Sequence, residues 1–163
     1  MSWSLDELRR QSVRPGNVTW IGLRPDRKLP MTVVESVMAN PKFGLEGDRY
    51  AGRSGKRQVT LIDQAHLQAV AGYLCRTQVD PGLVRRNIVV SGLNLRALKE
   101  GRFRIGEALL EYTDECHPCS RMEEALGTGG YNAMRGHGGI CARVLQAGVI
   151  RLNDPVSPVE AGT

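Results

Sequence analysis

Aromatic side chains are scarce in this chain of 163 residues: phenylalanine, tyrosine and tryptophan together make up 5% of it. A groove for single-stranded nucleic acid needs such rings for base stacking as well as cations for the backbone. Cations are present, with 22 Lys and Arg against 17 Asp and Glu and a formal net charge of +5, but they are scattered along the chain. We therefore expect a site for an anionic small molecule and no nucleic-acid partner.

Long apolar runs are also missing. No segment approaches the ~18 consecutive apolar residues that a membrane-spanning helix requires, and the first ten residues contain no apolar run. We expect a cytoplasmic protein with no membrane partner. The four cysteines, Cys75, Cys116, Cys119 and Cys141, are then expected to be reduced thiols rather than a disulfide framework.

Alternating and β-branched segments dominate the chain and predict strands, separated by Gly, Pro, Asp and Asn. The segments are "NVTWIGL", "MTVVESVMA", "RQVTLI", "NIVVSG", "RFRIGEALLEYT", "ICARVLQAG" and "VIRLNDPV". Because helices do not alternate regularly with these strands, the pattern favours a mainly β, largely antiparallel barrel with a few helices (an α+β fold) over a doubly wound parallel sheet. No repeat or linker divides it, so we expect one domain over residues 1–163.

Two helices are predicted outside the cysteine region. Ser4 with Glu7 three residues later is a capping box, which predicts a short opening helix. Asp63 is a candidate cap for a second helix, in which Leu67 and Val70 recur at helical spacing.

The stretch "ECHPCSRMEEALG" contains a C-x-x-C pair, Cys116 and Cys119, whose spacing leaves several functions open. With His137 and Cys141 the pair could form a tetrahedral Cys3His zinc site in a non-catalytic module. It could also be a redox dithiol, although the strand and helix alternation expected before such a motif is missing. Against zinc, Cys141 lies in a strand-like alternation, where a buried structural cysteine is the ordinary interpretation.

A third interpretation concerns Cys119 alone. Pro118 and the following "CSRMEEALG" predict a helix that begins near Cys119 and ends at Gly127. The unpaired N–H groups and the dipole at a helix start favour a thiolate, and Arg121 adds positive charge. A deprotonated sulfur there could ligate a metal, attack an electrophile or carry a sulfur atom.

Two segments could contribute to an anion-binding site. Arg85, Arg86 and Asn87 stand at a strand start, where guanidinium and amide groups could hold a phosphate or carboxylate. The Gly-rich stretch "GTGGYNAMRGHGGICARVL" could be a flexible lid that carries Arg135 and His137 toward the cysteines, or simply a turn. Neither the P-loop spacing nor a GxGxxG turn is present, which excludes those nucleotide-binding loops.

In order, "GLEGDRY", "RQVTLI", "RRNIVVSG", "GRFRIGEALLE", "CHPCSRM" and "GGICARVLQAGVIRLND" resemble the MOSC domain, named for the carboxy-terminal part of molybdenum cofactor sulfurases. The resemblance covers about residues 44–154. It implies a β-rich, partly barrel-like fold that binds molybdopterin-type cofactors through the pterin phosphate. The family's ligand cysteine falls on Cys119, whereas many relatives lack a cysteine at Cys116.

The resemblance therefore implies Cys119 as catalytic residue and molybdenum ligand. The expected cofactor-binding residues are Arg85, Arg86, Asn87, Arg121 and His137. The implied reactions are reduction of N-hydroxylated small molecules or sulfur transfer to a metal centre. A separate protein would donate the electrons or the sulfur, since no flavin, haem or iron–sulfur motif is present. A pyridoxal phosphate function would be inherited only from sulfurases that carry an additional desulfurase domain.

Overall fold

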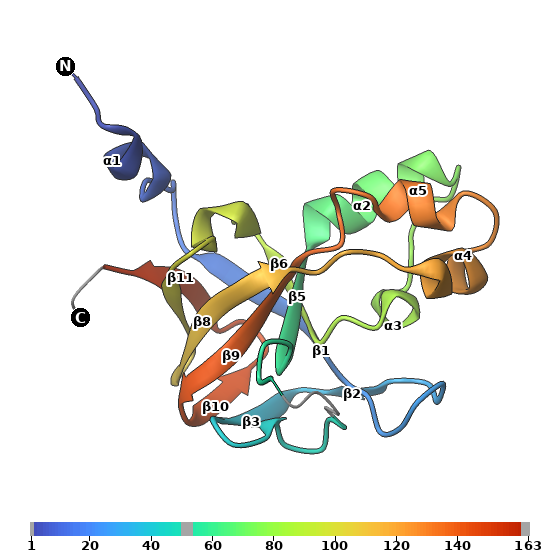
Figure 1. Ribbon diagram of the computed structural model, residues 1–163, viewed down its shortest axis with the longest axis horizontal. Helices are drawn as coiled ribbons and strands as arrows, with labels where there is room; N and C mark the ends of the chain where they lie inside the picture. Colours follow the sequence, from blue (N-terminus) through green and yellow to red (C-terminus); the bar gives the residue numbers. More distant parts are fainter. Residues whose placement is uncertain (1, 50–53, 161–163) are drawn as a thin grey trace.

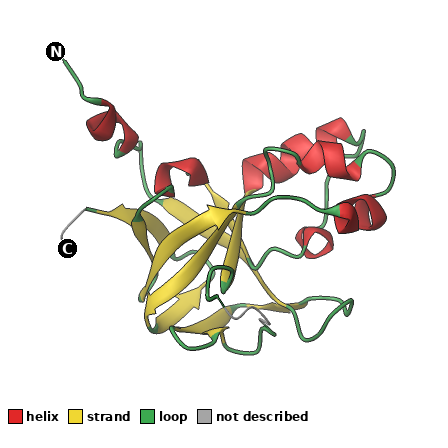
Figure 2. Cartoon of the chain, viewed as in Figure 1, coloured by secondary structure: helices red, strands yellow, loops and turns green. Residues whose placement is uncertain are grey.

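The computed structural model describes residues 2–49 and 54–160, so residues 50–53 of the Gly-rich segment after Gly47 lie outside it. Figure 1 shows a strand-rich body with most helices gathered at one end, and Figure 2 shows the same division by secondary structure. The expected α+β fold built on a β-barrel is confirmed. No helix among the described residues is long and apolar enough to cross a membrane.

Seven strands close into a barrel in the order β11-β7-β8-β9-β5-β6-β1, because β1 also pairs with β11. They are β1 (Gly16–Leu23), β5 (Val59–Asp63), β6 (Ile88–Ser91), β7 (Arg102–Ile105), β8 (Ala108–Glu115), β9 (Ile140–Gln146) and β11 (Pro155–Val159). Strands β5 and β6 run parallel, and the other neighbours run antiparallel. Closure leaves the barrel strands without a free edge.

Four shorter strands complete the β structure: β2 (Thr32–Val34), β3 (Ser36–Asn40), β4 (Gly44–Leu45) and β10 (Gly148–Arg151). Strand β2 pairs with β1, whereas β10, β3 and β4 form a separate sheet of three strands. The predicted strand segments therefore form strands, some of them divided into two by a turn.

Alternation along the strands fills the barrel with apolar side chains. In β7, Phe103 and Ile105 are fully buried, whereas Arg102 and Arg104 point to solvent. The largest fully buried side chains of the barrel core include Ile21, Leu45, Leu61, Ile88, Leu98, Leu110 and Ile150. Burial of this kind provides most of the driving force for folding.

The helices are α1 (Leu5–Arg9), α2 (Gln64–Tyr73), α3 (Pro81–Val84), the 3-10 helix η1 (Leu95–Leu98), α4 (Ser120–Leu126) and α5 (Gly130–Met134). Helix α1 projects from the barrel, and α2, α3, α4 and α5 gather at the opposite side of the view (Figure 1). A second apolar cluster joins that group to the barrel, with Ile62, Val89, Met122, Leu126 and Met134 among its members.

The capping box in the sequence predicted the start of α1, whereas the hydrogen bond made by Asp63 was not predicted. The Ser4 hydroxyl accepts from the Glu7 N–H and the Glu7 carboxylate accepts from the Ser4 N–H, so the capping box is confirmed. Asp63 does precede α2, but its carboxylate accepts from the Leu95 N–H at 3.1 Å and makes no capping bond. Asp63 therefore occupies the predicted N-cap position of α2, but its side chain ties β5 to η1.

Candidate functional site

The C-x-x-C pair spans the end of β8 and the start of α4. Cys116 is 2% exposed and is anchored in the barrel wall, where its N–H donates to the Gly139 carbonyl at 2.8 Å. Cys119 is exposed and occupies the N-cap position of α4, which ends before Gly127 as the sequence predicted. The two sulfurs therefore lie in different surroundings, one internal and one presented to solvent.

Cys119 has the accessibility that a ligand or sulfur carrier requires. It lies in extended backbone, with φ of −132°, and its side chain makes no capping hydrogen bond to the described residues. The buried side chains of Met122 and Leu126 attach α4 to the second apolar cluster. A rigid element thus presents the sulfur outward.

The sequence predicted a thiolate at Cys119. The structure instead gives an electrostatic reason for a thiolate at Cys116. Its sulfur accepts from the Cys141 thiol, and the cations of Arg86, Arg57 and Arg24 reinforce the effect, which lowers the pKa of Cys116 to about 6 against the opposing effect of burial. The Arg57 guanidinium lies 3.3 Å from the sulfur. Donating to Cys116, together with burial, raises the pKa of Cys141.

This arrangement predicts a pH-dependent contribution to stability. The pKa of Cys116 is depressed in the fold from an ordinary 9.0 to about 6, so its stabilisation is present above the ordinary value and is lost as pH falls through about 6. As pH rises from about 6 to about 8, the free energy of unfolding of the natural chain should therefore increase relative to that of Cys116→Ser, by at most ~1.4 kcal/mol per pH unit. Urea unfolding of both chains across this range checks the slope, and parallel curves would contradict it.

Arg86 is buried and its guanidinium donates to backbone carbonyls. The acceptors are Gly138 at 2.8 Å, Val84 at 2.8 Å and Cys116 at 3.4 Å. These bonds tie the start of β6 to residues 116–119, called the cysteine turn below, and to the connection between α5 and β9. Arg86 was expected to hold an anionic cofactor, but its donors are directed at the protein itself.

Asn87 is fully buried and is likewise used internally. Its carbonyl oxygen accepts from the N–H and hydroxyl of Thr60, at 3.0 and 3.1 Å. Its amide donates to the Gly22 carbonyl and to Asp48, at 3.0 and 3.2 Å. This side chain therefore joins β1, β5 and β6 rather than facing a cofactor, contrary to the role expected from the sequence.

Arg85 is half-buried and lies in a positively charged neighbourhood. Burial, then Arg24 and Arg121, lower the pKa of Arg85, while Asp48 opposes them. The exposed Arg121 is in the first turn of α4, two residues after Cys119. The guanidinium of Arg85 thus lies close enough to those of Arg24 and Arg121 to interact with both, and such a concentration of positive charge favours an anion.

Two of these cations also shape the backbone around them. Arg85 donates to the carbonyls of Leu29 at 2.5 Å and Asp26 at 3.2 Å, and so holds the loop after β1. Arg24 forms a bidentate pair with the buried Asp48, at 3.1 and 2.8 Å. A further cation, Arg57, interacts electrostatically with both Cys116 and Cys119.

The His137 side chain contacts its own loop and α2. Its Nδ1 lies 2.9 Å from the Arg135 carbonyl, and its ring packs edge-on against His66 and Tyr73 of α2. The backbone is tightly packed at Gly139, where a Cβ would lie 1.9 Å from the Leu61 carbonyl oxygen and φ is +87°. The Gly-rich stretch forms helix α5, a short connection and strand β9.

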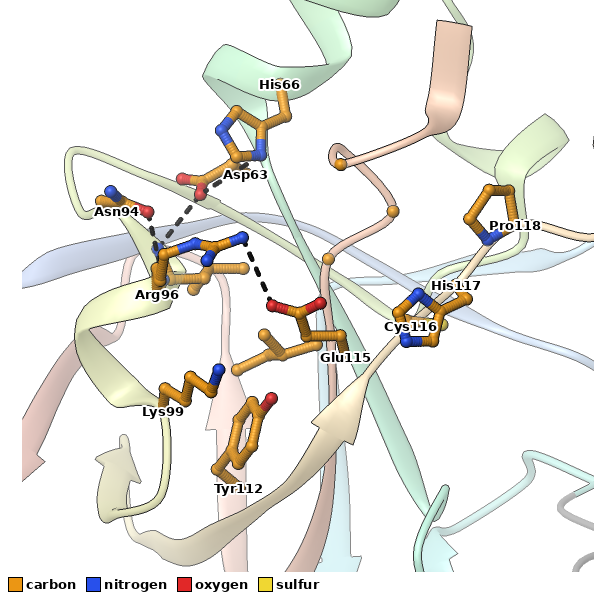
Figure 3. Close-up of a pocket in the computed structure, with 15 residues that line it drawn as sticks. Asp63, His66, Asn94, Arg96, Lys99, Tyr112, Glu115, Cys116, His117 and Pro118 are labelled. Atoms are coloured by element: carbon orange, nitrogen blue, oxygen red, sulfur yellow. Dashed lines mark hydrogen bonds and ion pairs between the residues drawn. The ribbon is translucent and has the colours of Figure 1, made fainter. Parts of the chain in front are cut away.

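A cavity of about 190 Å³ lies beside the cysteine turn and contains residues that the sequence did not single out (Figure 3). It is lined by Cys116, by the ion pair of Arg96 with Glu115 at 3.3 Å, and by Asp63, whose carboxylate lies 3.8 Å from His66 Nδ1. Burial raises the pKa of Asp63, with the Leu95 N–H and His66 opposing it. These groups come from separate elements, so no local motif could have revealed the cavity.

The geometry required by the zinc alternative is not formed. Among residues 2–49 and 54–160, no three His, Cys, Asp or Glu residues are placed to hold a metal ion together. Cys116 and Cys141 are buried neighbours, whereas Cys119 is exposed and His137 packs on α2. The four proposed ligands, Cys116, Cys119, His137 and Cys141, therefore do not gather around one point.

Comparison with solved structures finds the same fold in proteins of low identity. The YUAD protein from Bacillus subtilis aligns with a TM-score of 0.75 at 18% identity, over 90% of this chain and 97% of that one. YiiM from Geobacillus stearothermophilus gives 0.72 at 19%, over 91% and 77%. YiiM from Escherichia coli gives 0.66 at 21%, over 92% and 71%. A search of curated proteins finds no match.

A family model provides the assignment that these low identities cannot. The model of the MOSC domain matches residues 36–157, which include barrel strands β5 to β9, most of β11 and all of the cysteine turn. The matched range extends the resemblance noted in the sequence by a few residues at each end. This chain belongs to the MOSC domain family.

Proposed function

We propose that this chain binds a molybdenum cofactor of the molybdopterin type at the exposed edge formed by the start of α4, with Cys119 as the molybdenum ligand. The observation that carries the proposal is the exposed Cys119 sulfur beside a concentration of arginines. A soft thiolate suits molybdenum, and guanidinium groups suit a phosphate.

The donor set fits such a group. Arg121 is exposed next to Cys119, and Arg85 lies close enough to Arg121 for their charges to interact. Arg57 interacts electrostatically with Cys119 from the other side of the turn. Arg86 and Asn87 would act indirectly, by fixing the backbone of the cysteine turn and the start of β6.

The bound group would supply two-electron redox chemistry, for reduction of an N-hydroxylated or similar small molecule, with electrons from a separate protein. The chain's own residues would present one sulfur, neutralise the phosphate and position the turn. Sulfur transfer is the alternative use of the same sulfur, with Cys119 carrying a persulfide. Mass spectrometry of the Cys119 peptide after exposure to a sulfur donor distinguishes the two uses.

The binding step is tested directly on protein from a host that makes the cofactor. We expect molybdenum and pterin to co-purify with the chain in comparable amounts. Arg121→Glu should lower both about tenfold or more, because an ionic hydrogen bond to phosphate is worth ~1.5–3 kcal/mol. Arg104→Glu, on the exposed face of β7, is the matched control and should retain both. Absence of molybdenum and pterin from the natural chain would refute the proposal.

A further inference from the structure

The most unusual charge in the barrel wall is the guanidinium of Arg86, which is 6% exposed. No carboxylate within residues 2–49 and 54–160 forms an ion pair with it, and its donors end on backbone carbonyls. A buried cation normally has a counter-ion, because leaving it without one costs several kcal/mol. The thiol of Cys116, whose own carbonyl Arg86 contacts, can ionise negatively and interacts electrostatically with Arg86.

Cys116 also has a second thiol beside it. Strands β8 and β9 pair with Asp114 opposite Cys141, and the Cys116 N–H bonds to the Gly139 carbonyl, so Cys116 and Cys141 are diagonal neighbours on one face. Both are almost fully buried, at 2% and 1% exposure. Each thiol is among the causes that shift the pKa of the other, lowering that of Cys116 and raising that of Cys141, so the two groups interact directly.

The pair is buried but not sealed. Cys116 lines the cavity of about 190 Å³, together with His117 and the Gly138–Gly139 backbone (Figure 3). A molecule the size of hydrogen peroxide fits this space. The guanidinium groups of Arg57 and Arg86 favour attack by Cys116, because they stabilise its sulfur as a thiolate before it reacts.

We infer that Cys116 and Cys141 form a peroxide-sensitive dithiol site beneath the exposed cysteine, with Cys116 as the attacking thiolate and Cys141 as the resolving thiol. The inference is independent of any cofactor at Cys119. Neither sulfur has a role in the proposed molybdenum site, and the C-x-x-C partner of Cys116 in sequence is not its partner in this reaction.

The reaction balances with hydrogen peroxide as the oxidant. The Cys116 thiolate attacks one peroxide oxygen, the O–O bond breaks, and Cys116 sulfenic acid and hydroxide form. The Cys141 thiol then attacks the sulfenic sulfur, a disulfide forms, and water leaves with the thiol proton. Two electrons pass from the two sulfurs to the peroxide, and a dithiol reductant restores the pair.

Oxidation would change the surroundings of Cys119. The anion beside Arg57 disappears, and Arg57 interacts with both sulfurs. Arg86 loses the negative charge of the Cys116 thiolate. Its hydrogen bonds to the carbonyls of Gly138 and Cys116 still hold the cysteine turn to the connection between α5 and β9. The site therefore links the redox state of the barrel wall to the charge around the exposed edge.

Peroxide treatment followed by peptide mass spectrometry tests the inference in the full-length chain. The Cys119→Ser background leaves Cys116 as the one cysteine of its tryptic peptide, so the assignment is unambiguous and owes nothing to cofactor binding. We expect a disulfide between Cys116 and Cys141 that dithiothreitol reverses. Oxidation of Cys75, which is exposed at the end of α2 and outside this pair, should be at least about tenfold slower.

Two further variants separate the roles. In Cys141→Ser, Cys116 sulfenic acid should accumulate and be trapped by dimedone. In Arg57→Gln, oxidation of Cys116 should slow several-fold near pH 6, where the cations of Arg57, Arg86 and Arg24 and the Cys141 thiol set the thiolate fraction. Circular dichroism confirms that each variant is folded. Cys116 remaining reduced while Cys75 oxidises, or a Cys116 sulfenic acid that never links to Cys141 in the parent chain, would overturn the inference.

Discussion

Replacing Asn87 by Ala is expected to lower the free energy of unfolding by about 3 kcal/mol or more. The side chain is fully buried and makes four hydrogen bonds, which reach Thr60, Gly22 and Asp48. Removing it leaves several of these buried groups without partners and opens a cavity, and both effects destabilise. Urea unfolding of the two chains measures the difference.

The matched control is Asn132→Ala on the exposed surface of α5. Asn132 accepts a 3.4 Å bond from Arg135, but both residues face solvent. Its loss should change the free energy of unfolding by no more than about 0.5 kcal/mol. Equal effects at the two positions would show that the network around Asn87 does not support the barrel in the way described.

Cys119→Ser is expected to lower the molybdenum content of the purified chain about tenfold or more without loss of stability. The serine oxygen is a poor substitute for a soft sulfur ligand. The same position is the N-cap of α4, where serine is a preferred residue, so the helix should gain about 0.5 to 1 kcal/mol. A loss of metal therefore cannot be attributed to unfolding of the helix.

Cys75→Ser is the control for this comparison, since Cys75 is the other exposed cysteine and follows α2. Its molybdenum content should equal that of the natural chain. Retention of full molybdenum by Cys119→Ser would move the ligand role away from this sulfur.

The parts of the structure that depend on neighbours in sequence were predictable. The capping box at Ser4 and the start and stop of α4 at Cys119 and Gly127 follow from groups a few residues apart. Period-2 alternation placed the strands, because a half-buried strand requires it. Most neighbouring strands of the barrel are antiparallel, as that pattern favoured, whereas the parallel pair β5 and β6 is connected through α2 and α3.

The contacts that define the site could not be read in the same way. Arg57 meets Cys116 across 59 positions of sequence, and Arg86 meets Gly138 across 52. Arg86 and Asn87 look like anion ligands in sequence, because their type and spacing do not reveal whether their donors end on a ligand or on the backbone. The low pKa of Cys116 has the same origin, since cations from distant segments create it.

The most direct test of the account's central claim is the selenium K-edge absorption spectrum of a Cys119→selenocysteine chain purified from a host that makes the cofactor. The account predicts a molybdenum atom at bonding distance from selenium. A spectrum in which the selenium has only its own carbon as a neighbour, in a sample that contains molybdenum and pterin, would contradict it.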